Sequence, residues 1–378
     1  MKNLLFGTTA LVAAGVIASA VYADQGVKLG LGGYYQGAAG ILFNQDHGND
    51  DAGHNTRDVV FRQDVEVYFT GETTLDNGLT VGAEIQMEGQ QSDDQIDEVW
   101  AYFKGGWGQV RFGDDDDASE QIGYLIPSAS YLFGVDSPDF EFGNNRGGGN
   151  GAAFQTNVTL LDISGDATKV IYFSPTFDGF SFAVSFAPDR RGEDQYSGGS
   201  NGFNPGGTSY SNNFGQVQNV FSAAIEFDHS FNGVSLASGV GFAEGQWENP
   251  VPNQDQTTWG MNAHLDVTYA GFTLGGSMAY RSNYTTVGAG SDYMIYGVGG
   301  TYSWDAWTVG LAWSHGDYEY ASSHDNDKLD IVEFTGRYDL SPGISIDGMA
   351  GVNNLNTAKG ERTNYTAWEG GVGFNINF

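Results

Sequence analysis

The sequence predicts an all-β protein, a 16-stranded antiparallel transmembrane β-barrel. Three observations lead to this prediction. Segments in which apolar and polar residues alternate recur along the chain, as in strands with one apolar face. Short turns alternate with long polar loops, which is typical of membrane barrels. After the first 23 residues, no segment has the roughly 18 consecutive apolar residues that a spanning helix needs.

The N-terminus has the features of a signal peptide. Lys2 precedes an uncharged, largely apolar stretch from 4 to 21, and Ala23 completes a small-residue cleavage site. We therefore expect residues 1–23 to be removed and 24–378 to form a single barrel. The alternative is a membrane anchor that is retained.

Composition and charge narrow the possible functions. The chain has 57 Gly, 20 Tyr and 25 Phe but no Cys, which favours extensive strand pairing over a disulfide-linked scaffold. Its 47 acidic and 15 basic residues give a net charge of −32. Nucleic acid is excluded as a partner, because phosphate binding needs basic surface. The same excess of acid would attract cations.

Alternation is clearest in the segments 59–72, 79–88 and 368–378. It places one set of side chains toward lipid and the other toward the interior of a barrel. By this count, the interior set includes these charged residues: Arg62, Asp64, Glu66, Glu84, Glu88, Lys104, Arg111, Arg281 and Arg337.

The connections predict the number of strands. Seven are short and rich in Gly, Asn and Asp, the chemistry of tight hairpins, at 76–78, 105–108, 177–179, 231–233, 270–271, 304–306 and 341–343. Eight are long and polar, near 43–57, 90–95, 114–167, 188–216, 245–258, 283–291, 319–327 and 354–363. Seven turns and eight loops join sixteen strands.

Two local motifs and the last residue resemble those of the general diffusion porins of Gram-negative bacteria, in their alphaproteobacterial branch. The motifs are EVWAYFKGGWGQVRFG at 98–113 and VIYFSP at 170–175, the second followed by a Phe-Asp-Gly-Phe turn. The resemblance implies a homotrimeric channel of the bacterial outer membrane, which lets small hydrophilic solutes diffuse passively. It also implies contacts with outer-membrane lipid and lipopolysaccharide, and that Phe374, Ile376 and Phe378 are the signal for the barrel-assembly machinery.

The resemblance further implies that the third external loop, 114–167, folds into the lumen as a constriction. Its length alone calls for a functional explanation. An inward fold is expected to line the pore with the loop's carboxylates, among them Asp114, Asp115, Asp116, Asp117, Glu120, Asp136, Asp139 and Glu141. These would face the basic wall residues and make the channel prefer cations.

Alternatives remain for parts of this interpretation. No cofactor is required, but Asp114–Asp117 could bind Ca²⁺ weakly; the EF-hand spacing is absent and a solvated acidic loop is the simpler explanation. His264 and Asp266 share an interior face, yet no activated nucleophile accompanies them, so an enzyme is not expected. Loop aromatics would suit a solute-specific channel, and long loops would suit a structural or adhesive barrel.

Overall fold

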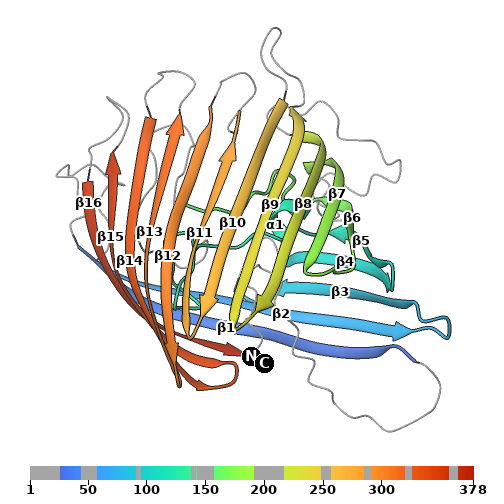
Figure 1. Ribbon diagram of the computed structural model, residues 1–378, viewed down its shortest axis with the longest axis horizontal. Helices are drawn as coiled ribbons and strands as arrows, with labels where there is room; N and C mark the ends of the chain where they lie inside the picture. The colour runs from blue at the N-terminus through green and yellow to red at the C-terminus, as the bar shows by residue number, and fades with distance from the viewer. Residues whose placement is uncertain are drawn as a thin grey trace.

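The fold is a closed antiparallel β-barrel (Figure 1). The computed structural model describes residues 26–43, 58–90, 95–137, 142, 157–190, 217–247, 257–284, 291–319, 326–356 and 365–378. The expected signal peptide lies outside these residues. Each strand pairs with its neighbours in sequence, and β1 pairs with β16 to close the sheet. No helix among the described residues is long and apolar enough to span a membrane.

The prediction of sixteen strands is confirmed, and one short helix accompanies them. The elements are β1 (Lys28–Phe43), β2 (Val59–Thr74), β3 (Thr80–Glu88), β4 (Ile96–Gly105), β5 (Gly108–Asp114), α1 (Ala118–Gln121), β6 (Thr168–Phe173), β7 (Phe180–Asp189), β8 (Val217–Phe231), β9 (Val234–Trp247), β10 (Thr257–Tyr269), β11 (Phe272–Arg281), β12 (Tyr293–Trp304), β13 (Trp307–Glu319), β14 (Asn326–Ser341), β15 (Ile344–Asn356) and β16 (Tyr365–Asn377).

The seven predicted short turns join strands as expected. At the β8–β9 turn, Asn232 and Gly233 have φ of 48° and 84°. Positive φ at both central residues matches the twist of a tight hairpin, which explains the Asn-Gly sequence. At the barrel's seam, the backbones of Gly33 and Phe378 exchange two hydrogen bonds of 3.0 Å. The last residue therefore takes part in closing the barrel.

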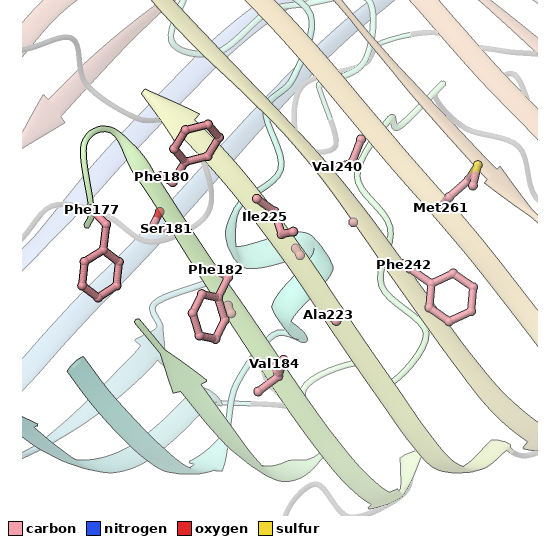
Figure 2. Close-up of a pocket in the computed structure, with 13 residues that line it drawn as sticks. Phe177, Phe180, Ser181, Phe182, Val184, Ala223, Ile225, Val240, Phe242 and Met261 are labelled. Carbon is pink, nitrogen blue, oxygen red and sulfur yellow. The ribbon is translucent and has the colours of Figure 1, made fainter. Parts of the chain in front are cut away.

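The outer face is apolar over much of its area. Exposed large side chains alternate along the strands, including Leu31, Phe61, Phe112, Phe182, Ile225, Leu265, Leu311, Phe334 and Phe374. An apolar groove of about 490 Å³ lies on this face. Residues of β7–β10 line it, among them Phe182, Ile225 and Phe242 (Figure 2). Such a surface is stable when covered by lipid chains.

Aromatic rings gather at the end of the barrel that carries the short turns. Phe272 lies 4.2 Å from Tyr302, and Trp307 lies 4.7 Å from Tyr338, measured between ring centroids. Rings with one apolar and one polar side favour the interface between lipid and water. The residues between the exposed apolar ones form the opposite, inward set of the closed barrel.

Candidate functional site

The segment after β5 begins with a buried salt bridge. Arg111 donates to Asp115 over 3.0 Å, and the Asp115 side chain is 1% exposed. The Arg111 guanidinium also lies over the rings of Trp100 and Phe173, at 4.9 and 4.8 Å. Asp114 still belongs to β5, pairs with Thr168 and accepts its hydroxyl hydrogen bond.

Asp117 caps α1 and anchors the segment. Its carboxylate accepts hydrogen bonds from the Ser119 backbone at 2.9 Å, the Ser222 hydroxyl at 2.9 Å and the Ile163 backbone at 3.1 Å. A carboxylate at this position satisfies amides that the first turn of a helix leaves without partners. Burial raises the pKa of Asp117 to about 6, and the charge of Asp162 adds to the effect.

The helix packs against inward-facing residues of three strands. The Ala118 amide donates to the Ser185 hydroxyl of β7 at 3.0 Å, and the Ser119 amide donates to the Ser222 hydroxyl of β8 at 2.8 Å. On β10, the Asn262 side chain donates to the Ser119 carbonyl at 2.9 Å. These contacts hold α1 at β7–β10, on the side opposite the apolar groove.

Beyond α1, residues 122–131 lie against inward-facing side chains of successive strands as far as β15. Tyr124 donates to Glu226 of β8 at 2.9 Å, and its ring lies 4.1 Å from that of His264. Further along, the Ala129 amide donates to the Thr335 hydroxyl at 3.1 Å.

Asp347 of β15 holds the next part of the segment. It accepts hydrogen bonds from the Ser130 hydroxyl at 2.8 Å and the Tyr131 amide at 2.7 Å. Segment 115–137 thus contacts strands far from its own in the barrel.

Glycines on the inner face make room for this segment. A Cβ at Gly40 would lie 2.5 Å from the ring of Phe142, and one at Gly371 would lie 2.7 Å from the same ring. On β12, a Cβ at Gly297 would lie 2.4 Å from Ile126. Because a larger residue would collide, these glycines permit close approach of the segment to the wall.

The returning part of the segment is tied to the outgoing part. Thr159 donates to Asp136 at 2.6 Å, and the Ile126 amide donates to the same carboxylate at 2.8 Å. Asn157 donates to Ser314 of β13 at 3.0 Å. Burial raises the pKa of Asp136 to about 7, although both hydrogen bonds stabilise its charged form.

The packing of the segment should depend on pH through Asp136. The packed form holds the Asp136 proton more tightly than an unfolded chain, so its stability falls as the pH rises from about 4 to 7. We expect hydrogen exchange of 126–136, corrected for intrinsic rates, to show a loss of about 1–3 kcal/mol between pH 5 and pH 8. Asp136→Asn should flatten most of this dependence, leaving the smaller share of Asp117. A variant with the wild-type pH profile would contradict the assignment.

The sequence led us to expect that the loop carboxylates line an open pore, but most of those that the structure describes are buried. Asp114, Asp115, Asp116, Asp117 and Asp136 are each at most 9% exposed. Glu120 is partly exposed, and burial beside Asp116 raises its pKa. The physical cause of this burial is hydrogen bonding, since Asp117 and Asp136 accept bonds from the backbone and hydroxyls that pack around them. Asp139 and Glu141 lie outside the described residues.

The basic residues of the inward set are mostly engaged. Arg281 is 7% exposed and donates to the carbonyl of Asp162 at 3.3 Å, so it does not face open space. Arg337 forms a salt bridge of 3.0 Å with Asp339 and lies 3.9 Å from the centre of the Tyr131 ring. Lys104 pairs with Thr80 and is exposed. Arg62 is partly buried on β2.

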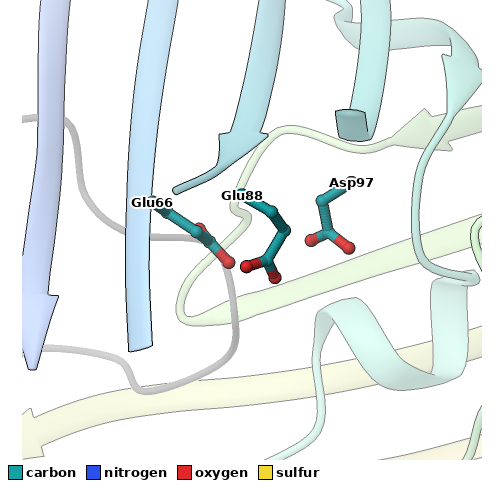
Figure 3. Close-up of side chains that lie close together, drawn as sticks. All are labelled: Glu66, Glu88 and Asp97. Carbon is teal, nitrogen blue, oxygen red and sulfur yellow. The ribbon is translucent and has the colours of Figure 1, made fainter. Parts of the chain in front are cut away.

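A group of carboxylates lies on the inner wall formed by β2, β3 and β4. Figure 3 shows Glu66, Glu88 and Asp97 pointing toward one another, with one oxygen of each within 4.8 Å of the others. Together with Asp64 and Glu84, they are called here the β2–β4 carboxylates. Glu98, Asp116 and Asp166 form a second, more buried group of the same spacing. Oxygen groups like these suit hard cations such as Ca²⁺.

Some of these residues were not singled out from sequence. Asp97 follows a shift of register between β3 and β4, which simple alternation does not reveal. Alternation along β15 places Asp347 on the inward face, but only the fold shows that it accepts a hydrogen bond from Ser130. Of the loop aromatics, Phe133 and Phe142 are buried against the wall, at 2% and 4% exposure. They are therefore not available as a binding surface for solutes.

An apolar outer face, a polar interior and complete closure define the class of outer-membrane β-barrels. The sequence matches the Gram-negative porin family over residues 7–358, and the chain belongs to that family. It is therefore a protein of the bacterial outer membrane, a channel for passive diffusion. No curated protein matches the sequence.

Solved structures show the same fold. The outer membrane channel DcaP of Acinetobacter baumannii is 15% identical, with a TM-score of 0.61 covering 96% of this chain and 100% of that one. A porin refined at 1.8 Å is 17% identical, with a TM-score of 0.55 over 93% and 100%. OmpT of Vibrio cholerae, in a trimer form, is 13% identical, with a TM-score of 0.58 over 93% and 100%.

Proposed function

We propose that this porin conducts ions and small hydrophilic solutes with a preference for cations, and that the β2–β4 carboxylates set this preference. The observation that carries the proposal is their position on the inner wall, where all but the buried Glu66 are partly exposed. Two of the basic residues expected to oppose them, Arg111 and Arg337, are neutralised by Asp115 and Asp339. Carboxylates on a low-dielectric wall raise the local concentration of cations.

In this proposal, segment 114–167 narrows the channel by its bulk and not by its charge. Its contacts with inward-facing residues from β7 to β16 support a position inside the barrel. Described carboxylates of the segment, such as Asp117 and Asp136, accept hydrogen bonds that hold it in place. The sequence predicted that the loop carboxylates set the selectivity, and we propose instead that the β2–β4 carboxylates on the opposite wall set it.

The rival function is a solute-specific channel. Tyr124, beside Glu226 and His264, gives an aromatic and acidic surface that could bind an organic cation. Flux that saturates with solute concentration would favour this function.

The expected association of the chain follows the family. We propose a homotrimer in contact with outer-membrane lipid and lipopolysaccharide, inserted by the barrel-assembly machinery through its C-terminal aromatic signal. The trimer form of Vibrio cholerae OmpT supports the first point. The outward position of Phe374 and its neighbours, 42% exposed at Phe374, is compatible with the last.

Reversal potential in a planar bilayer with a KCl gradient tests the proposed function. The wild-type channel should prefer K⁺ over Cl⁻, and the triple variant Glu66→Gln, Glu84→Gln and Glu88→Gln should lower this preference by a factor of about two or more. Glu244→Gln, on the outer face of β9, removes one charge without touching the interior and serves as the control.

Three results would count against the proposal. An anion-selective wild type would refute the preference itself. Unchanged selectivity in the triple variant would remove the β2–β4 carboxylates from the explanation. A barrel without conductance would show that the channel is closed in this protein.

A further inference from the structure

Two glutamates converge on the inner wall formed by β14, β15 and β16. Glu333 of β14 and Glu369 of β16 both lie opposite Gly351, on the strand between them. The position that a Cβ would take at Gly351 is 3.0 Å from Glu333 Cγ and 3.3 Å from Glu369 Oε1. The glycine thus leaves room for two carboxyl side chains to approach each other.

Both glutamates are buried, and most of their oxygens are unsatisfied. Glu333 is 4% exposed and Glu369 is 5% exposed. Glu333 Oε2 and both carboxyl oxygens of Glu369 accept no hydrogen bond of acceptable geometry within the described parts of the chain. The side chain of Asn353 and the backbone of Phe142 are the polar groups that interact with Glu369, although neither forms a hydrogen bond of good geometry. A buried carboxylate in this state is costly unless another charge compensates it.

Among the residues that the structure describes, the neighbouring charges do not balance the pair. Glu333 interacts with the charges of Glu369 and Asp136, and Glu369 interacts with that of Arg62. Three carboxyl groups therefore face one guanidinium, which leaves two negative charges when all are ionised. A divalent cation matches this excess.

The donors also suit calcium more than a smaller ion. Ca²⁺ is coordinated by carboxylates, through one or both oxygens, and by amide carbonyls and waters. The geometry of these ligands is flexible. Asn353, fully buried and two residues from Gly351 on the same inward set, offers an amide oxygen close by. Mg²⁺ would demand a stricter octahedral geometry than side chains from three strands provide.

The other acidic groups are better satisfied by the protein itself. Glu66 accepts a hydrogen bond from Tyr68, Glu88 accepts one from Gln90, and Glu98 accepts one from the Asp116 amide. The carboxylates on β14 and β16 differ because two of them lie side by side across Gly351, with three of their four oxygens unsatisfied among the described residues.

We propose that Glu333 and Glu369 bind one calcium ion on the inner wall of the barrel, beside Phe142. The ion would neutralise the pair and hold β14 and β16 together across Gly351. This role concerns the stability of the barrel and is separate from the choice of solutes.

Equilibrium dialysis with radioactive Ca²⁺ on the purified, folded barrel tests this site. The protein is first freed of metal with EGTA. The wild type should then bind one more Ca²⁺ per chain than Glu333→Gln or Glu369→Gln. In these two variants, the affinity of this site for Ca²⁺ should be at least about tenfold weaker. Glu244→Gln, an exposed glutamate of β9, should bind as the wild type does. Equal binding by all four proteins would overturn the proposal.

A measurement on the unmodified protein makes the test independent of how the variants fold. EGTA should lower the temperature at which the wild-type barrel loses its compact form on a gel, and added Ca²⁺ should restore it. The Gln variants should not respond to either. A wild type that neither binds Ca²⁺ nor responds to EGTA would show that protons neutralise the pair, and the calcium site would be wrong.

Discussion

Asp117→Ala should release the start of the loop segment from the barrel wall and raise the hydrogen exchange of 115–124 by about 100-fold. The carboxylate accepts hydrogen bonds from Ser119, Ser222 and Ile163, and the side chain is fully buried. Alanine would leave the Ile163 amide and the Ser222 hydroxyl without this acceptor, while the Ser119 amide keeps its bond to Ser222. Each buried unsatisfied group costs about 1–3 kcal/mol. Because the structure can partly relax, we expect a net loss of about 3 kcal/mol in the local stability of 115–124. This loss corresponds to the stated change in hydrogen exchange.

Exchange measured by mass spectrometry on the folded barrel checks this prediction. Asp76→Ala, in the exposed β2–β3 turn, is the matched control and should leave exchange of 115–124 as in the wild type. Protection that survives Asp117→Ala would mean that the packing of α1 on β7–β9 suffices without its cap. The role given to the carboxylate would then be wrong.

The second large effect is expected at the other end of the segment. Asp347→Ala should detach Ser130 and Tyr131 from β15, because both donate to the same carboxylate oxygen. The side chain is fully buried and also accepts from Ser345 at 2.5 Å. We expect a loss of about 2–4 kcal/mol in the local stability of 128–133, seen as faster exchange there. If the segment narrows the channel, the single-channel current should also become larger and noisier.

Asp347→Asn provides the control for this experiment. Its amide keeps one oxygen that can accept the bonds from Ser130 and Tyr131, so exchange of 128–133 should stay closer to the wild type than in the alanine variant. Equal effects of Asn and Ala would indicate that charge, through Arg337, matters more than the hydrogen bonds. Faster exchange with an unchanged current would separate the anchoring role from the proposed narrowing.

The barrel could be predicted from sequence because its rules are local. Alternation decides which face each strand side chain takes, and the Gly and Asn residues of the short turns decide where strands reverse. Segments such as 59–74 and 344–356 follow both rules. The number and order of the strands could therefore be predicted from the sequence. The short helix was not, because four residues after Asp117 carry no helical periodicity.

The site depended on contacts between residues far apart in the chain. Sequence identified the acidic residues at 114–117 but could not show that Ser222 and Ile163 use Asp117 as an acceptor. It likewise gave no sign that Glu333 and Glu369 meet across Gly351, since 36 residues of sequence separate them.

By itself, then, the sequence determined the class of fold, the sixteen strands, the face of residues in regularly alternating strands and the excess of negative charge. Those properties follow from period-two alternation, turn chemistry and composition. Only the tertiary structure decided which charges are exposed. Burial depends on what the long segment packs against, and closure of the barrel brings β5 and β15 residues within reach of the same segment. Loop carboxylates such as Asp117 and Asp136 are buried acceptors of hydrogen bonds, whereas Asp64 and Glu84 on the wall stay partly exposed.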